Sequence, residues 1–214
     1  MIPGTRASSI PMNHAAPSPT LWLARHAVVT QGAGRCYGRL DWPAEAAATQ
    51  AAAQALARRL PAHVCVAQVS PRRRCVQLAE ALAALRPGLR WRVDARLAEM
   101  DFGAWEGQTW EEIGRTAMDA WLADFMDARA GGGESVRAFM ARVGAAWDEW
   151  RANGNGDGGS GDALWLTHAG VMRAALLLAR GVRLPAAASE WPAQMLSPGQ
   201  VLCLNAAEYQ IYLT

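Results

Sequence analysis

Arginine and histidine side chains follow three separate apolar runs of the sequence. They are Arg25-His26, Arg72 to Arg74, and His168. One histidine in such a position is more often structural than catalytic, and arginines at the start of a helix are disfavoured by the helix dipole. Their joint occurrence favours one common explanation, which is a binding site for a compact anion with several negative charges.

Phosphate is the anion that best fits these residue types. Guanidinium groups bind phosphoryl oxygens in pairs, and a helix beginning at Ala169, directly after His168, would add backbone N–H groups that bind substrate. One histidine can act as a nucleophile at phosphorus, because a neutral imidazole is available near its ordinary pKa of about 6.5. The other can stabilise charge on the phosphoryl oxygens. The residue types therefore predict phosphoryl transfer and leave the role of each histidine open.

A departing alkoxide needs a proton, so a carboxyl group is expected nearby. Glu99, in the irregular stretch 95–107, is the best-placed candidate, and Asp101 and Glu106 compete with it. Burial beside the negative charge of a phosphate would keep such a glutamate protonated.

Strands and helices alternate in the elements that must position these residues. Apolar runs without helical periodicity predict strands, and alanine-rich or amphipathic stretches predict helices. Strands are expected at 20–25, 64–70, 90–94 and 163–168, with two more within 199–214, and helices at 43–60, 72–88, 109–130, 131–152 and 169–181. This alternation predicts a mostly parallel sheet covered on both faces, with chemistry beyond the carboxyl ends of its strands.

Length and composition limit the domain organisation and the possible partners. The 214 residues are 51% hydrophobic and 19% charged, which suits one globular domain over 20–214. Residues 1–19 are expected to be a flexible tail without the apolar core of a secretory signal, and 153–162 a glycine-rich surface loop. A net charge of +2 gives no strong field for nucleic acid or membranes, and no window approaches the length of about 18 apolar residues that a membrane span needs.

The four cysteines are irregularly spaced, with no metal-ligand pattern. We expect buried free thiols in a reducing compartment, and therefore a cytoplasmic protein. The expected partner is a small-molecule phosphate ester, without nucleic acid or membrane, while a homodimer stays open.

Four motifs together resemble the histidine phosphatase superfamily, also called phosphoglycerate mutase-like. They are LARHA, SPRRRCVQLAEAL, LAEMDFGAWEG and LWLTHAGVMRAALL, in the family's order across 21–180. The resemblance implies a three-layer αβα sandwich, whose central sheet is mostly parallel with an antiparallel edge strand. It places the arginine of the family pattern Ser-Pro-x-x-Arg at Arg74, which leaves Arg72 and Arg73 as surface residues.

The resemblance also implies roles for five residues. His26 would be the phosphorylated nucleophile and Glu99 the proton donor. Arg25, Arg74 and His168 would hold the phosphoryl group. No metal ion and no other cofactor is expected, because these side chains would supply the charge that metal ions supply elsewhere.

Two positions depart from the family pattern. Ala27 stands where the family usually has Gly after the nucleophile, and the family's usual Asn a few residues later is missing, so that Gln31 could replace it. By analogy with the family's phosphate loop, Tyr37 and Gly38 would line the pocket entrance.

The segment GRCYGRLDWP at 34–43 resembles a version found among bacterial α-ribazole phosphatase-like members, which act late in cobalamin assembly. EMDFGAWEG fits that subgroup as well. The expected function is therefore hydrolysis of α-ribazole 5′-phosphate through a phosphohistidine. Some tryptophans could stack on a benzimidazole-like base, although packing is the commoner role for such residues. They include Trp42, Trp105, Trp110 and Trp121.

Three alternatives stay open: a phosphoglycerate mutase, a small-molecule phosphatase of broad specificity, and a phosphate-ester binding protein without catalysis. The family's mutases usually carry a longer insertion before the second histidine, and the shorter segment here favours hydrolysis. The complete set His26, Glu99 and His168 argues against a protein that has lost catalysis.

Overall fold

The computed structural model describes residues 19–154, 161–193, 197–205 and 211–213. The tail predicted at 1–19, apart from its last residue, lies outside the described residues. So does most of the loop predicted at 153–162.

The described strands form one six-stranded sheet in the order β3-β2-β4-β1-β5-β6. The strands are β1 Thr20–Arg25, β2 Val66–Val69, β3 Arg90–Val93, β4 Ala163–Thr167, β5 Val201–Asn205 and β6 Ile211–Leu213. The first four pair in parallel, whereas β5 runs antiparallel to both β1 and β6. The predicted fold class is confirmed. The antiparallel strand is β5, and the short strand β6 pairs with it at the edge of the sheet.

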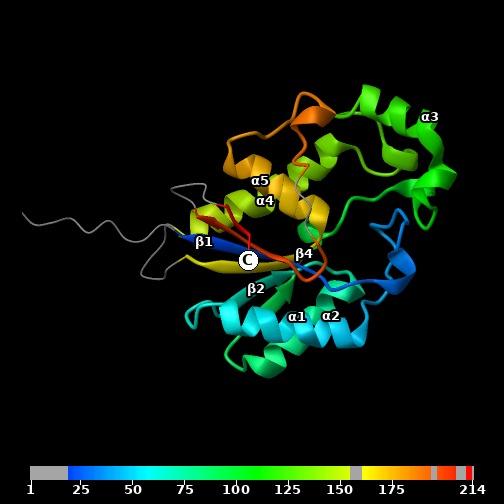
Figure 1. The fold of residues 1–214 in the computed structure, drawn as a ribbon. Helices are drawn as coiled ribbons and strands as arrows, with labels where there is room; N and C mark the ends of the chain where they lie inside the picture. The colour runs from blue at the N-terminus through cyan, green and yellow to red at the C-terminus, as the bar shows by residue number, and fades with distance from the viewer. Residues whose placement is uncertain (1–18, 155–160, 194–196, 206–210, 214) are drawn as a thin grey trace, which may run out of the picture.

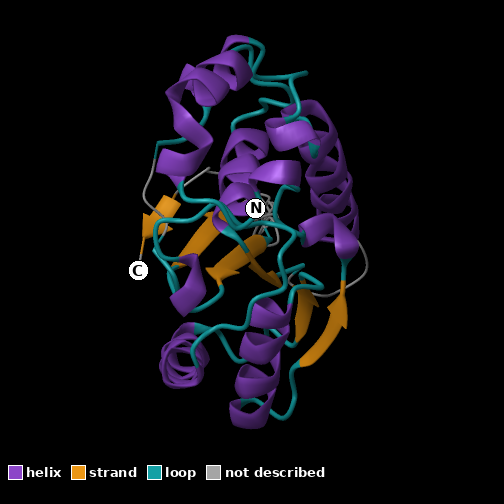
Figure 2. Cartoon of the chain, turned by 90° about the vertical axis from the view of Figure 1, so that its right-hand side faces the viewer, coloured by secondary structure: helices purple, strands orange, loops and turns teal. Residues whose placement is uncertain are grey.

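Helices cover both faces of this sheet and complete the three layers (Figures 1 and 2). The α-helices are α1 Ala46–Arg59, α2 Arg73–Leu85, α3 Trp110–Ala123, α4 Val136–Gly154 and α5 Ala169–Ala179. The short 3₁₀ turns are η1 Thr30–Gly32, η2 Ala95–Leu97, η3 Gly103–Trp105, η4 Ala130–Gly132 and η5 Ala188–Glu190. In the described part of the chain, none of these helices is long and apolar enough to cross a membrane.

Strand β1 separates two apolar cores because its side chains alternate between the two faces of the sheet. Leu21 and Leu23 belong to the core beneath α4 and α5, while Ala24 belongs to the core beneath α1 and α2. Helix α5 is buried almost all round, which matches its run of apolar residues. The strand is thereby fixed from both sides, and its last residues have a defined position.

Helix α3 lies away from the sheet, on the side toward which β1 runs (Figure 1). It begins with a capping box, in which the Thr109 hydroxyl accepts from the N–H of Glu112, and the Glu112 carboxylate accepts from the N–H of Thr109. It ends at Ala123 rather than at residue 130, so the prediction of a helix over 109–130 is too long.

The glycine run at residues 131–133 is not helical, although a helix was predicted from residue 131. Gly131 has a φ of 57° and Gly132 a φ of 77°, and α4 begins only at Val136. The cause is a close contact between two backbones: a Cβ on Gly133 would lie 2.1 Å from the carbonyl oxygen of Asp101. Tertiary packing here overrides the local pattern.

We predict that Gly133→Ala destabilises the fold by about 2 kcal/mol, because the added methyl group forces the two backbones apart. The matched control is Gly88→Ala, where an added Cβ meets nothing within 4 Å and the change should stay below about 1 kcal/mol. Urea unfolding of both variants measures the difference. Equal stability of the two variants would contradict the contact.

Candidate active site

His26 and His168 lie side by side at one edge of the sheet, because they directly follow β1 and β4, which are parallel neighbours. Arg25 pairs with Thr167 in the register, and the N–H of His26 donates to the carbonyl of Thr167 at 3.1 Å. The rings of His26 and His168 are consequently 5.1 Å apart, centroid to centroid. Strand pairing alone thus brings together two residues that are 142 positions apart in the sequence.

The imidazole of His26 is buried and held in one tautomer. Its Nδ1 lies 2.7 Å from the carbonyl oxygen of Ala27, and because a carbonyl only accepts, Nδ1 carries the hydrogen. Burial first, and then the positive charge of Arg74, hold the pKa of His26 well below its ordinary value. The ring is therefore neutral, and its lone pair is on Nε2.

The guanidinium of Arg74, in the first turn of α2, is completely buried. It donates to the carbonyl oxygens of Leu40 at 2.7 Å and Gly38 at 2.9 Å, and its carbon lies 5.1 Å from the centre of the Tyr37 ring. Burial lowers the pKa of Arg74, but an arginine stays charged in proteins. A fixed positive charge therefore faces both histidines.

His168 is the link between Arg74 and the end of strand β2. Its Nδ1 accepts from Nε of Arg74 at 3.3 Å, so the neutral ring carries its hydrogen on Nε2 and donates it to the Ser70 hydroxyl at 2.7 Å. Burial, followed by the charge of Arg74, lowers the pKa of His168 well below its ordinary value. Ser70 was not among the predicted site residues, although it begins the Ser-Pro-x-x-Arg pattern.

Glu99 reaches the first turn of α5 from the loop between η2 and η3. Its carboxylate accepts the N–H of Gly170 at 3.0 Å and the N–H of Met100 at 3.1 Å. A Cβ on Gly170 would lie 2.1 Å from Glu99 Oε1, so only glycine lets the carboxylate reach this helix end. One of the backbone N–H groups at this helix start, that of Gly170, therefore bonds to Glu99 in this structure.

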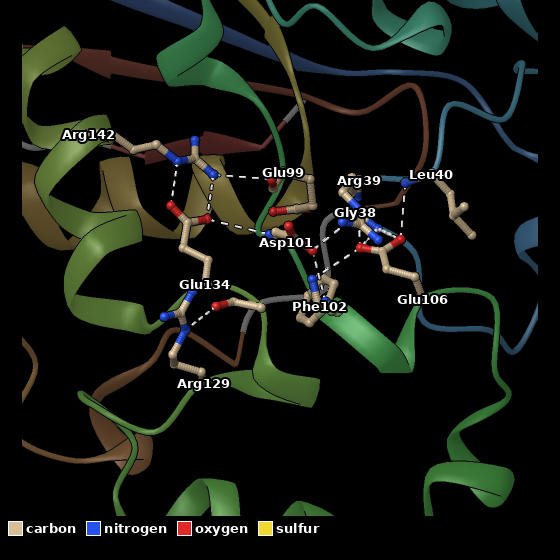
Figure 3. Close-up of polar contacts among 12 residues, drawn as sticks. Gly38, Arg39, Leu40, Glu99, Asp101, Phe102, Glu106, Arg129, Glu134 and Arg142 are labelled. Atoms are coloured by element: carbon tan, nitrogen blue, oxygen red, sulfur yellow. Dashed lines mark hydrogen bonds and ion pairs between the residues drawn. The ribbon is translucent and has the colours of Figure 1, made fainter.

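The two competing carboxylates have other partners. Glu106 accepts the backbone N–H groups of Gly38, Arg39, Leu40 and Phe102 (Figure 3). Asp101 accepts the N–H of Gly103 and lies 3.6 Å from Nε of Arg39. Of the three, Glu99 alone is among the described residues that line the cavity holding the histidines. The geometry therefore favours Glu99 as the acid.

That cavity has a volume of about 750 Å³ and two chemically different parts. The inner part is formed by Arg25, His26, Arg74, Glu99 and His168. The rest of the wall, which we call the outer part, is largely aromatic, with Phe102, Trp105, Trp110, Trp121, Phe125, Phe139 and Trp191. Within the described ranges, no group of three or more His, Cys, Asp or Glu side chains could hold a metal ion.

A family model described as the histidine phosphatase superfamily (branch 1) matches residues 21–208. The chain belongs to this superfamily. A comparison with curated proteins finds no match.

Solved structures of other proteins agree with the histidine phosphatase fold. A mycobacterial glucosyl-3-phosphoglycerate phosphatase is 26% identical with a TM-score of 0.71, and the alignment covers 92% of this chain and 97% of that one. Its complex with VO₃ gives a TM-score of 0.73 at the same identity and coverage. The protein TTHB049 from Thermus thermophilus is 27% identical with a TM-score of 0.66, covering 90% of this chain and 96% of that one.

Other predicted residues of this histidine phosphatase lie at different distances from the cavity. Tyr37 lines it, whereas Gly38 contributes its carbonyl to Arg74. Gln31 is exposed in η1 and, like Ala169, is not among the lining residues, so the structure does not bring Gln31 to the site. Ala27 packs in a small buried apolar cluster, which accommodates its methyl group.

Arginines and tryptophans differ in how well sequence reasoning placed them. Arg73 is exposed, as predicted, but Arg72 is half-buried. Arg173 lines the cavity and was missed, although it lies within the motif LWLTHAGVMRAALL and within α5. Trp42 packs against Tyr37 and does not line the cavity.

We predict that stability falls as the pH drops from about 7.5 to about 5.5, because the unfolded chain protonates its histidines near pH 6.5 while the buried rings stay neutral. Each buried histidine contributes up to about 1.4 kcal/mol per pH unit. Urea unfolding of His26→Gln across this range should show a shallower slope than the unchanged protein. His63→Gln, which removes an exposed imidazole, is the control, and an equal loss of slope in both variants would contradict the prediction.

Proposed function

We propose that this histidine phosphatase hydrolyses phosphate monoesters through a phosphohistidine at His26. One observation carries the proposal: the hydrogen bond from Nδ1 to the carbonyl of Ala27 leaves the lone pair of a neutral imidazole on Nε2. That nitrogen belongs to a residue lining the cavity that also contains Arg25, Arg74 and Glu99. Neutral nitrogen is the nucleophilic form, and adjacent positive charge attracts the phosphate.

In the first step, Nε2 of His26 attacks phosphorus as the bond to the leaving oxygen breaks. Glu99 gives a proton to that oxygen, and the alcohol leaves. Arg25 and Arg74 stabilise the negative charge on the other phosphoryl oxygens, and His168, hydrogen-bonded to Nε of Arg74 through its Nδ1, holds that guanidinium in place. Because Arg74 is already fixed by two carbonyl groups, little reorganisation is needed when the charge develops.

In the second step, water attacks phosphorus and the nitrogen–phosphorus bond breaks. Glu99 now takes a proton from the water. His26 returns to its neutral form and inorganic phosphate leaves. The charge needed at phosphorus comes from side chains, so the proposal requires no metal ion.

The proposed substrate is α-ribazole 5′-phosphate, which would place the protein in cobalamin biosynthesis. The aromatic outer part of the cavity supports this proposal, since a flat base can stack there. Trp110 is the most suitable face, because it lines the cavity and is 47% exposed.

Similarity to a glucosyl-3-phosphoglycerate phosphatase favours a phosphorylated sugar acid as the second candidate. A mutase acting on 3-phosphoglycerate and a phosphatase of broad specificity are the remaining catalytic alternatives. They differ from the main proposal in the product or in the range of substrates.

His26→Ala should abolish turnover, because the other imidazole in the described lining of the cavity, that of His168, has its two ring nitrogens bonded to Arg74 and Ser70. A phosphoenzyme trapped from the unchanged protein should be labile to acid and stable to base, and absent from the variant. Activity is expected to persist in EDTA. Substantial turnover by His26→Ala, or full dependence on added Mg²⁺, would overturn the mechanism.

A phosphate-release screen over α-ribazole 5′-phosphate, glucosyl-3-phosphoglycerate, 3-phosphoglycerate, sugar phosphates and nucleotides should show selective turnover of the first. Trp110→Ala should lower kcat/KM for that substrate about tenfold, the typical loss when one stacked base loses its aromatic partner. Leu122→Ala, exposed on the same helix and outside the cavity, is the matched control. Isomerisation of 3-phosphoglycerate without phosphate release would indicate a mutase, and a flat profile would indicate broad specificity.

A further inference from the structure

The loop that carries Glu99 is held by an arginine of α4. Arg142 donates from Nη1 to the carbonyl oxygens of Arg96 and Ala98, both at 2.7 Å, and from Nη2 to the carbonyl of Glu99 itself at 3.1 Å (Figure 3). These three hydrogen bonds therefore fix the main chain from which the Glu99 side chain extends.

The guanidinium of Arg142 is itself held in place. Glu134 accepts from Nε at 2.8 Å and from Nη2 at 2.9 Å, and the Arg142 and Glu134 side chains are only 23% and 16% exposed. The Phe139 ring packs against the guanidinium, with its centre 4.6 Å from the guanidinium carbon. A paired and partly buried group of this kind has little freedom to move.

Glu134 also fixes the chain on the far side of Glu99. Its backbone N–H donates to the carbonyl of Asp101 at 2.7 Å, and its carboxylate lies 3.4 Å from the N–H of the same residue. The Arg142–Glu134 pair therefore holds the loop both before and after Glu99 (Figure 3).

We propose that Arg142, supported by Glu134, is a positioning residue for proton transfer by Glu99. The proposal rests on the proposed function, in which Glu99 is the acid. A general acid must lie within hydrogen-bond reach of the leaving oxygen, and a displacement of about 1 Å can cost a factor of about 100 in rate. Arg142 does not line the cavity that holds the histidines, so it acts through the position of Glu99.

The test compares two substrates that differ in their need for a proton. Nitrophenolate leaves p-nitrophenyl phosphate unprotonated, whereas the more basic phenolate of phenyl phosphate is assisted by an acid. Arg142→Gln should lower kcat/KM for phenyl phosphate about tenfold more than for p-nitrophenyl phosphate, a fraction of the effect of a full general acid. Both substrates are measured on one sample, so an unfolded fraction cancels from the ratio.

Three further variants separate this inference from the function beneath it. Glu99→Gln should show a larger selective loss, about 100-fold, and Arg142→Gln added to it should cause no further selective loss. Arg137 lies on the same helix as Arg142 and forms an exposed ion pair with Asp127. Arg137→Gln should leave the ratio of the two kcat/KM values unchanged.

Each outcome has one meaning. A uniform loss on both substrates by Glu99→Gln would overturn the role of Glu99 in the proposed function. A selective loss by Glu99→Gln with a uniform loss by Arg142→Gln would overturn only the positioning role. A selective loss by Arg142→Gln that adds fully to that of Glu99→Gln would also overturn it.

Discussion

The rest of the site depends on one constraint, which is the burial of the positive charge of Arg74. Removing a charge from water is costly unless other groups replace the lost hydration. Here the carbonyl oxygens of Gly38 and Leu40 do so, while the N–H groups of the same two residues donate to Glu106. The peptide group between Gly38 and Arg39 also has its carbonyl on Arg74 and its N–H on Glu106, so a polarised peptide group lies between the Glu106 carboxylate and the buried cation. Glu106 is needed for this arrangement although it does not line the cavity.

Burial first, and then that charge, set the protonation of both histidines. Neutral rings cost less to bury beside a guanidinium than charged ones, which is why His26 and His168 have lowered pKa values. A bound phosphate would bring negative charge to the same place and relieve the repulsion between like charges. The folded protein is thus prepared for an anion at some cost to its stability in acid.

Sequence reasoning succeeded where a local pattern determines the result. The apolar runs of β1 and β4 and the residues that follow them predicted the convergence of His26 and His168, because parallel strands end at the same edge of a sheet. It was weaker for Glu99, since Asp101 and Glu106 lie within eight residues of it and all three are acids. Only their partners distinguish them: backbone N–H groups of a distant loop for Glu106, and the start of α5 for Glu99.

Contacts between distant main-chain segments could not be predicted at all. Gly131 and Gly133 fit a helix start by their position, and their real role, close packing against residues 101–105, depends on the folded chain. Arg142 is 43 residues from Glu99 and bonds to carbonyl groups, which every residue has. The types of the residues whose carbonyl groups accept these hydrogen bonds therefore do not indicate such a partner.

The two parts of the cavity differ in origin, and this separates the chemistry from the choice of substrate. Apart from Glu99, which lies in a loop, the inner groups come from strand ends and helix starts of the sandwich, where pairing and burial leave little freedom. The outer wall is a series of aromatic contacts, with Trp105 and Trp121 at 6.0 Å and Trp121 and Phe125 at 5.3 Å between ring centres. Helix α3, which supplies part of this wall, packs away from the sheet. Its side chains can therefore change the alcohol that is accepted while the phosphate end stays the same.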